Sequence, residues 1–439
     1  MAVVDSLVIK KGSEFLPIDS YDNEMIDEII YEGQSFHFAK QKDLTGTTEI
    51  VADNGVDEPI ISLGVNGATL QSGTPTPEAP IPIENANDNG MSMVLHGKNL
   101  ALATQMFNKN GKYNANVTLD GRNCVRCLQT NTTSHAILGG FKEKTQYTFI
   151  FDYAFVRAEG TNVTQNGAIF YIKYTDGSQS VVAWNWQYDK FTKKIYTSTA
   201  GKTIKGIGNI NADYRAWIYI DKDTFGVYEG AIADPIYEPY FRETIEIPTS
   251  IDVDGTNVPL RFSEYDKLTV DRLGNKVVYI NGTYVITYDE NKINTSSIYL
   301  NPQAGTNFYF HRVANSTFLV NGKGLSTHFP EKPWYPLQKN YSFGALSDNN
   351  YTNIAFRLTG TETLAEFKQF MIDIANTGNP VIVQAQRFTP IEYDITSTDL
   401  GQSLLALATR KGTNYLEISS DLAPSQTDLS YWRQIIPNE

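Results

Sequence analysis

The 439-residue sequence is poor in cysteine and histidine, has no cluster of basic residues and contains no long apolar run. Its 36 Lys and Arg stand against 49 Asp and Glu, so the formal net charge is -13. Proteins that bind nucleic acid or anionic membranes normally present Lys/Arg-rich surfaces, which this composition does not supply. No run of about 18 apolar residues predicts a membrane-spanning helix. Residues 1–30 also lack the basic start and apolar run of a signal peptide. We therefore predict neither a nucleic-acid partner nor insertion into a membrane.

The only two cysteines, Cys124 and Cys127, lie in the segment GRNCVRCLQTN. A thioredoxin-type C-x-x-C site requires the start of a helix, and a zinc site requires further ligands. The flanking residues indicate a strand instead, on which residues three apart point to opposite faces. The pair is therefore predicted to be two buried free thiols, without a disulfide framework.

Motifs of catalysis and metal binding are also missing. The chain has no H-E-x-x-H, P-loop, G-x-G-x-x-G or G-x-S-x-G sequence, and none of its five histidines pairs at metal-ligand spacing. Acidic residues are so numerous that a glycosidase pair stays open, with Glu238 and Glu243 as the nearest local candidates. The DVDG segment, Asp252–Gly255, resembles the start of a calcium loop without its downstream ligands, which leaves a structural calcium ion open. We predict a protein that is not an enzyme and has no cofactor.

Strand-forming segments fill most of the sequence. Between residues 96 and 245, and again between 246 and 439, short stretches rich in aromatic and β-branched residues alternate with turn residues. This pattern predicts an all-β chain of two jelly-roll-like β-sandwiches in tandem, 96–245 and 246–439. Residues 1–50 are predicted to be a small attachment segment, in which Met25–Ile30 favours a short amphipathic helical turn.

Three local features of the sequence make sharper predictions. In the segment 51–95, Asn66-Gly67 between two β-rich arms predicts a β-hairpin, and the Pro-rich stretch Pro75–Pro82 predicts a stiff, extended linker. One helix is predicted in the second sandwich. Thr363 and Glu366 form a capping box, and Gly378 ends the helix. Its predicted apolar face consists of Leu364, Phe367, Phe370, Met371 and Ile374.

Aromatic residues are the best candidates for contact with a ligand. In AWNWQY, Trp184, Trp186 and Tyr188 recur at every second residue, so a strand would place the three rings on one face and Asn185 and Gln187 on the other. Such a row forms either the core of a sandwich, which the need to fill an inner face favours, or a platform for a sugar ring. A second group, Trp334 and Tyr335, lies in the Pro-rich stretch HFPEKPWYPL, which indicates an exposed loop or interface.

Several of these segments together resemble a known family. NGATLQSGTPTPEAPIPIENANDNGMSMVLHGKNL, residues 66–100, resembles the linker of tail and baseplate proteins from phages that infect Gram-positive bacteria, in which G-T-P-x-P-x-x-P is followed by a strand and G-K-N-L. KEKTQYTFIFDYAF, YIKYTDGS and VYEGAIADPIYEPY resemble elements of their carbohydrate-binding-module-like jelly roll. The run TLAEFKQFMIDIANTGNPVIVQAQRFTPIEYDI resembles their last module. The resemblance covers roughly residues 60–400, and residues 1–50 and the final SQTDLSYWRQIIPNE depart from it.

The resemblance implies a component of the phage virion, made in the host cytoplasm and located in the tail tip or baseplate. It implies binding of host cell-wall glycan without catalysis. The implied partners are other tail and baseplate proteins and further copies of this chain, as a trimer or higher homo-oligomer. Two alternatives stay open: a structural hub or decoration protein that contacts only virion proteins, and a cell-wall polysaccharide depolymerase.

Overall fold

A computed structural model describes most of the chain. The described residues are 8–11, 14–17, 29–31, 34–42, 47–52, 58–101, 113–128, 134–135, 141–157, 168–183, 190–208, 216–272, 274–303, 306–313, 319–332, 340–347, 352–410, 412–420, 422 and 426–435. The structure is mostly β-strand, arranged in several antiparallel sheets. This confirms the predicted β class.

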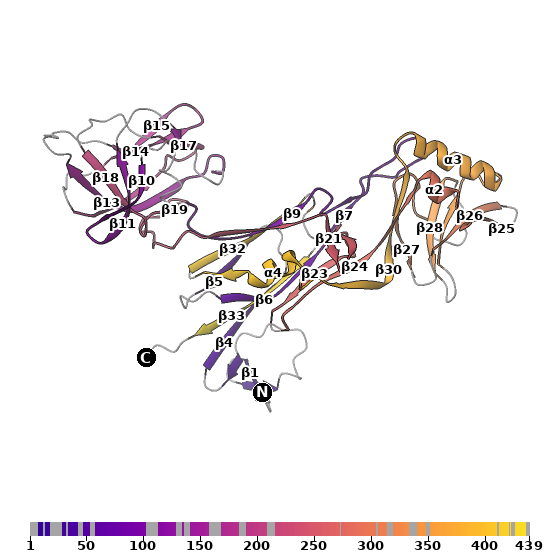
Figure 1. Ribbon diagram of the computed structural model, residues 1–439, viewed down its shortest axis with the longest axis horizontal. Helices are drawn as coiled ribbons and strands as arrows, with labels where there is room; N and C mark the ends of the chain where they lie inside the picture. The colour runs from indigo at the N-terminus through magenta and orange to yellow at the C-terminus, as the bar shows by residue number, and fades with distance from the viewer. Residues whose placement is uncertain are drawn as a thin grey trace.

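Buried apolar side chains form three large cores, and these define three parts of the molecule. The core of the sandwich module draws on residues 101–227, and that of the helix module on residues 286–385. The third core, that of the scaffold, combines side chains from 60–95, 241–279 and 395–416. Figure 1 shows the scaffold in the middle, with the sandwich module at one end of the long axis and the helix module at the other.

The scaffold contains the largest sheet, which joins strands from both ends of the chain. Its order is β2 (Glu14–Pro17), β1 (Val8–Lys11), β3 (Ile29–Tyr31), β4 (Gln34–Lys42), β33 (Gln426–Ile435), β6 (Glu58–Asn66), β23 (Lys267–Asp271), β24 (Lys276–Tyr288), β30 (Val381–Asp394) and β27 (Leu319–Ser326), and β31 (Ala408–Thr409) also pairs with β6. A second sheet has the order β20 (Arg242–Ile247), β9 (Met91–Gly97), β32 (Gly412–Ser419) and β5 (Thr47–Ala52). The carboxyl-terminal strands β32 and β33 therefore complete sheets that amino-terminal strands begin.

This pairing differs from a serial chain of domains. Strands from 1–50, from 51–95 and from 246–439 share sheets, and the two modules are inserted between strands of the scaffold. The final stretch of the sequence supplies β33, between β4 and β6. Each antiparallel partner completes the hydrogen bonding of a strand that would otherwise lie at an edge.

The sandwich module consists of two sheets on one core. One has the order β10 (Tyr113–Leu119), β11 (Arg122–Leu128), β18 (Ala216–Asp221), β13 (Tyr147–Arg157) and β16 (Thr192–Thr197), with β19 (Gly226–Glu229) also paired to β13. The other has the order β12 (Ser134–His135), β17 (Ile204–Gly208), β14 (Ala168–Tyr174) and β15 (Gln179–Ala183). Alternate residues of β13, including Phe149, Phe151 and Tyr153, face the core, as the period of two in its sequence requires.

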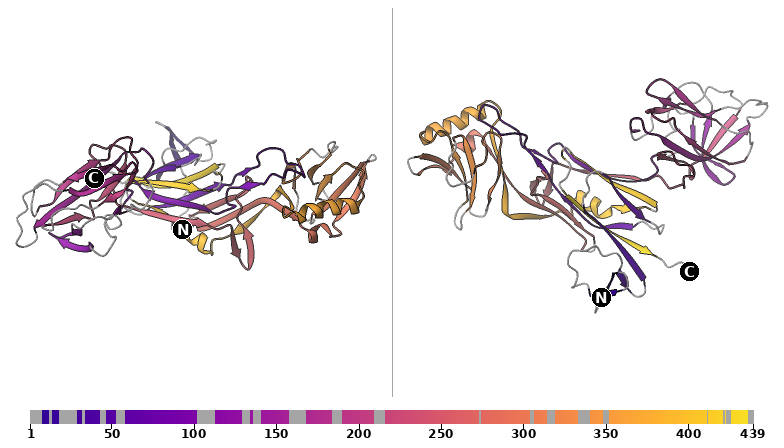
Figure 2. Two further views of the ribbon diagram at one scale, coloured as in Figure 1. Left: turned by 90° about the horizontal axis from the view of Figure 1, so that it is seen from above. Right: turned by 180° about the vertical axis from the view of Figure 1, so that it is seen from behind.

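The helix module extends from two long strands that begin in the scaffold. β24 and β30 run through both parts, and side chains of β24 enter both cores. The module adds a sheet of order β25 (Ile298–Gln303), β26 (Thr306–Val313), β29 (Thr352–Arg357) and β28 (Ser342–Ser347), the short helix α2 (Glu290–Ile293) and the helix α3 (Leu364–Asn376). Figure 2 shows the same end-to-end arrangement from above and from behind.

The predicted helix is confirmed as α3. Thr363 and Glu366 form the capping box, and Gly378 has a positive φ of 87° just beyond the last turn. Phe367, Met371 and Ile374 are buried, and Leu364 and Phe370 pack against the same core.

The hairpin predicted at Asn66-Gly67 is wrong. β6 pairs with β23, β33 and β31, whereas the next strand, β7 (Thr69–Leu70), pairs with β8 (Glu84–Asn85). Gly67 serves a close approach: a Cβ on it would lie 2.1 Å from the carbonyl oxygen of Phe262. The neighbouring Ala68 N–H donates to the same carbonyl at 2.9 Å, which fixes this crossing.

In residues 1–50, the predicted helical turn is also wrong where the structure describes it. Ile29 and Ile30 belong to β3, paired with β4, while Met25 and Ile26 lie outside the described residues. Apolar residues at adjacent positions fit either state in so short a segment.

The Pro-rich stretch packs along the helix module, but it is not extended throughout: Thr76 and Ala79 exchange two backbone hydrogen bonds of 3.2 Å, which close a tight turn within Pro75–Pro82. Ile81 N–H donates to the Thr327 carbonyl at 2.8 Å, and the Gln71 amide donates to the Ser326 carbonyl at 3.0 Å. The buried Gln384 of β30 donates to Thr69 Oγ1 and Asn85 Oδ1, at 3.2 and 3.1 Å. This segment therefore braces β27 and β30 where the helix module leaves the scaffold.

Candidate functional site

The aromatic candidates for sugar contact lie outside the described residues. The first group follows β15 directly and the second follows Lys332. The residues concerned are Trp184, Asn185, Trp186, Gln187, Tyr188, Trp334 and Tyr335. Whether each ring is a core or a surface residue stays a prediction.

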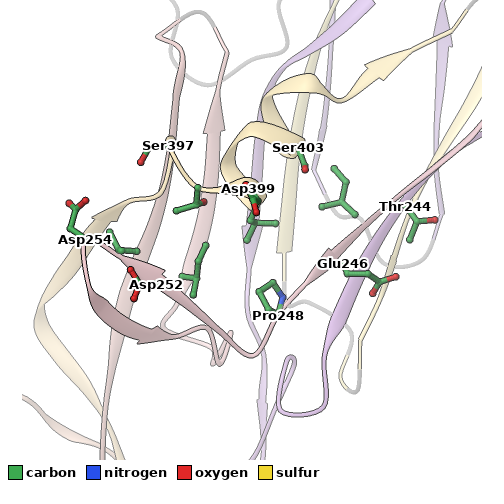
Figure 3. A pocket seen from close by; sticks show the side chains of 13 residues that line it. Thr244, Glu246, Pro248, Asp252, Asp254, Ser397, Asp399 and Ser403 are labelled. Carbon is green, nitrogen blue, oxygen red and sulfur yellow. The ribbon is translucent and has the colours of Figure 1, made fainter.

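A pocket of about 710 Å³ opens in the scaffold. It is lined by Thr244, Ile245 and Glu246 of β20, by Pro248, by Ile251–Asp254 of a hairpin, and by Ser397–Leu400 and Ser403 around the start of α4 (Asp399–Ala406). Figure 3 shows Thr244 and Glu246 on one side, Asp252 and Asp254 on the other, and Asp399 and Ser403 between them. Two stretches far apart in the sequence, 244–254 and 397–403, thus form one concave site.

β20 forms one wall of the pocket because of its alternating sequence, RETIEI. Ile245 and Ile247 are buried in the scaffold core, whereas Thr244 and Glu246 are exposed. β20 is the last strand of its sheet and, among the described strands, pairs only with β9.

The opposite wall is the hairpin of β21 (Ser250–Val253) and β22 (Thr256–Pro259). Asp254 and Gly255 both have positive φ, 52° and 79°, between the paired residues Val253 and Thr256, which is a type I′ turn. The Gly255 N–H donates to Asp252 Oδ1 at 2.9 Å. The DVDG segment is therefore a hairpin turn. Among the described residues, no three His, Cys, Asp or Glu side chains are grouped so as to hold a metal ion.

The third wall is α4, which the sequence analysis missed. Thr398 caps it by accepting from the Gly401 N–H at 3.1 Å, and Leu400, Leu404 and Leu405 are buried against the scaffold. The sequence does contain a signal for this helix: Thr398-Asp399 is followed by apolar residues four apart. Gly401 weakens that signal, but it is required because a Cβ there would meet the Ile395 carbonyl at 2.0 Å.

The pocket is acidic and has an aliphatic floor. Four of its lining residues, Glu246, Asp252, Asp254 and Asp399, carry carboxylates, and none is Lys, Arg, His or an aromatic residue. It therefore offers negative charge and hydrogen-bond acceptors to a ligand, but no flat ring for a sugar to stack on. Such a lining favours a cationic, extended ligand over a pyranose.

The other predicted polar candidates have structural partners. Glu238 accepts the Thr413 N–H at 3.0 Å, and Glu243 pairs with Arg410 at 3.5 Å. Both carboxylates therefore tie the return of the sandwich module to the carboxyl-terminal part of the scaffold.

Cys124 and Cys127 lie on a strand, as predicted, in β11. Cys124 is a buried free cysteine, and burial raises the pKa of its thiol to about 11, so it stays protonated and unreactive at neutral pH. The side chain of Cys127 lies outside the described part of the chain.

The G-K-N-L motif marks the junction of scaffold and sandwich module. The Asn99 amide donates to the carbonyls of Phe225 and Glu238, at 3.0 and 3.1 Å, and its Oδ1 accepts from the N–H groups of Ala101 and Val227. Asn99 is 1% exposed, so this one side chain joins the outgoing and returning segments of the module.

No helix in the described part of the chain has both the length and the apolar character needed to span a membrane. Comparison of the chain with protein-family models, with curated proteins and with solved structures finds no match.

Proposed function

We propose that this protein is a structural component of a phage tail tip or baseplate that binds host cell-wall glycan without catalysis. We further propose that its two distal modules are jelly-roll-like display units, of which the sandwich module belongs to the carbohydrate-binding-module class. The observation that carries the proposal is the architecture. Two β-rich modules with their own cores lie at opposite ends of a scaffold that is closed by strands from both ends of the chain.

This architecture supports display better than catalysis. The first and last described strands, β1 and β33, belong to one scaffold sheet, so attachment there leaves both modules projecting (Figure 1). Asn99 fixes one junction and the Pro-rich segment braces the other. Many copies on a symmetric particle would turn weak single-site sugar affinity into strong avidity.

The test is co-sedimentation of the full-length chain with purified cell walls from a panel of Gram-positive bacteria. We expect saturable binding that falls in Trp186→Ala or Trp334→Ala while the thermal transition is unchanged. Binding that both variants retain would remove these rings from the contact. Absence of binding to every wall would favour a purely structural hub.

Release of soluble sugar from the same walls would overturn the non-catalytic proposal in favour of a depolymerase. Loss of thermal stability in Trp186→Ala, by about 3–5 kcal/mol, would identify Trp186 as a core ring.

A further inference from the structure

The free edge of β20 has a definite hydrogen-bonding register. β20 and β9 pair with Arg242 opposite His96 and Ile245 opposite Met93. The Gly97 N–H donates to the Phe241 carbonyl at 3.0 Å, so Phe241 and Gly97 form a hydrogen-bonded pair. In an antiparallel ladder such pairs alternate, so the residues bonded to β9 are 243, 245 and 247.

The backbone groups of Arg242, Thr244 and Glu246 therefore point away from β9. No backbone or side-chain group in the described residues bonds to the N–H or carbonyl of Thr244 or Glu246. The same two residues line the pocket. The unpaired edge of β20 and the cavity thus coincide.

The cavity has room for one more strand and a charge that selects its sequence. A strand adds about 4.8 Å from its neighbour, and 710 Å³ accommodates a few extended residues. Glu246 on one wall, Asp252 and Asp254 on the other, and Asp399 beside them place carboxylates around that path (Figure 3). Alternate side chains of an added strand share a face, so basic residues at every second position would meet these carboxylates.

We propose that the edge of β20 receives an extended segment of another protein, with Lys or Arg at alternate positions, which adds as a strand to the β20–β9–β32–β5 sheet. The backbone of the added strand forms hydrogen bonds with the backbone of Thr244 and Glu246. The carboxylates of the pocket walls pair with the basic side chains of that strand. This interaction surface does not depend on glycan binding by the modules.

The probe is a short peptide of alternating lysine and threonine, titrated into the full-length protein by calorimetry. We expect saturable binding that weakens with added salt. The same peptide N-methylated through its central part keeps its charge but loses its backbone donors, and we expect it not to bind.

Two variants test the two halves of the site. The triple variant E246Q/D252N/D254N removes three charges and keeps the turn, because Asn also tolerates positive φ. We expect about tenfold weaker binding. Thr244→Pro removes a free-edge N–H without breaking a bond to β9, and we expect it to abolish binding.

The matched control E84Q/D223N/E392Q removes three exposed carboxylates elsewhere and should bind as the parent does. Absence of saturable binding, equal binding of the N-methylated peptide, or equal loss in the control variant would each overturn the proposal. The full-length protein could also self-associate. If E246Q/D252N/D254N abolishes that self-association and the peptide does not displace the second copy, the edge binds a second copy of this chain instead.

Discussion

The sandwich module and the helix module solve the same problem, attachment to the scaffold, in different ways. The sandwich module leaves after β9 and returns before β20, and its core shares no strand with that of the scaffold. The helix module grows out of β24 and β30, and Val277 and Tyr279 of β24 lie in the scaffold core while Ile286 and Tyr288 lie in the module core. The difference indicates that two parts of the molecule should unfold cooperatively where they share strands. We expect the sandwich module to unfold alone and the helix module to unfold with the scaffold.

Matched truncations of a core phenylalanine in each module should show the difference between the modules most strongly. Phe151 packs against Phe170 and Phe225 in the sandwich module, and Phe356 packs against Tyr288 and Phe367 in the helix module. Each Phe→Ala change should cost about 3–5 kcal/mol, because the cavity adds to the lost burial. In calorimetry, Phe151→Ala should lower one transition and leave the rest in place, whereas Phe356→Ala should lower the transition that includes the scaffold. A single transition shifted alike by both variants would refute independent unfolding.

The modules also differ in their buried titratable groups. The helix module buries His311, whose Nδ1 lies 3.0 Å from the Tyr288 hydroxyl, and His328. Among the side chains of the sandwich module that the structure describes, no histidine is buried. Burial, with a smaller effect of Lys292, lowers the pKa of His311 from 6.5 to about 4. The folded module therefore favours the neutral imidazole.

Protonation of His311 should destabilise the helix module in acid, an effect that shows fully only when the opposing carboxyl of Glu331 is removed. The stabilisation due to neutral His311 is complete above pH 6.5 and is lost as the pH falls towards 4, because the unfolded chain takes up the proton first. The loss reaches about 3 kcal/mol. Glu331 gains a similar amount, about 3 kcal/mol, over the same pH range, so the two contributions nearly offset each other in the parent protein. Thermal unfolding between pH 7 and 4 should therefore show the drop in Glu331→Gln, and adding His311→Gln should flatten it. An equal drop in the double variant would exclude His311 as its cause.

Glu331 opposes this effect in the same pH range. Burial raises the pKa of its carboxyl to about 7, so its contribution is complete below pH 4.5 and is lost as the pH rises through 7. Glu331→Gln should therefore make the acid destabilisation of the helix module steeper.

Local features of the fold could be predicted from the sequence, whereas the pairing of distant strands could not. The capping box at Thr363 is a short-range signal and appears as expected, and the period of two in β13 is a local pattern that its buried face follows. Nothing near Gln426 indicates that its strand pairs with β4 and β6. Partner choice depends on contacts across hundreds of residues, and an alternating strand fits many partners. The pocket was missed for the same reason, because α4 meets β20 and the β21–β22 hairpin, about 150 residues earlier in the chain, only after the sheets form.

The smallest expected effects concern the two junctions, where Asn99 holds the sandwich module and Gln384 helps to hold the helix module. Asn99→Ala leaves two carbonyls and two N–H groups without their partner at a 1% exposed site, which should cost about 2 kcal/mol. Gln384→Ala removes two bonds to side chains, which can rearrange, and should cost about 1 kcal/mol. Hydrogen exchange should show faster opening at Ala101 and Val227 in the first variant and near Thr69 and Asn85 in the second. If Asn99→Ala left those two amides protected, the return of β20 along β9 would itself be enough to hold the sandwich module, and Asn99 would only orient it.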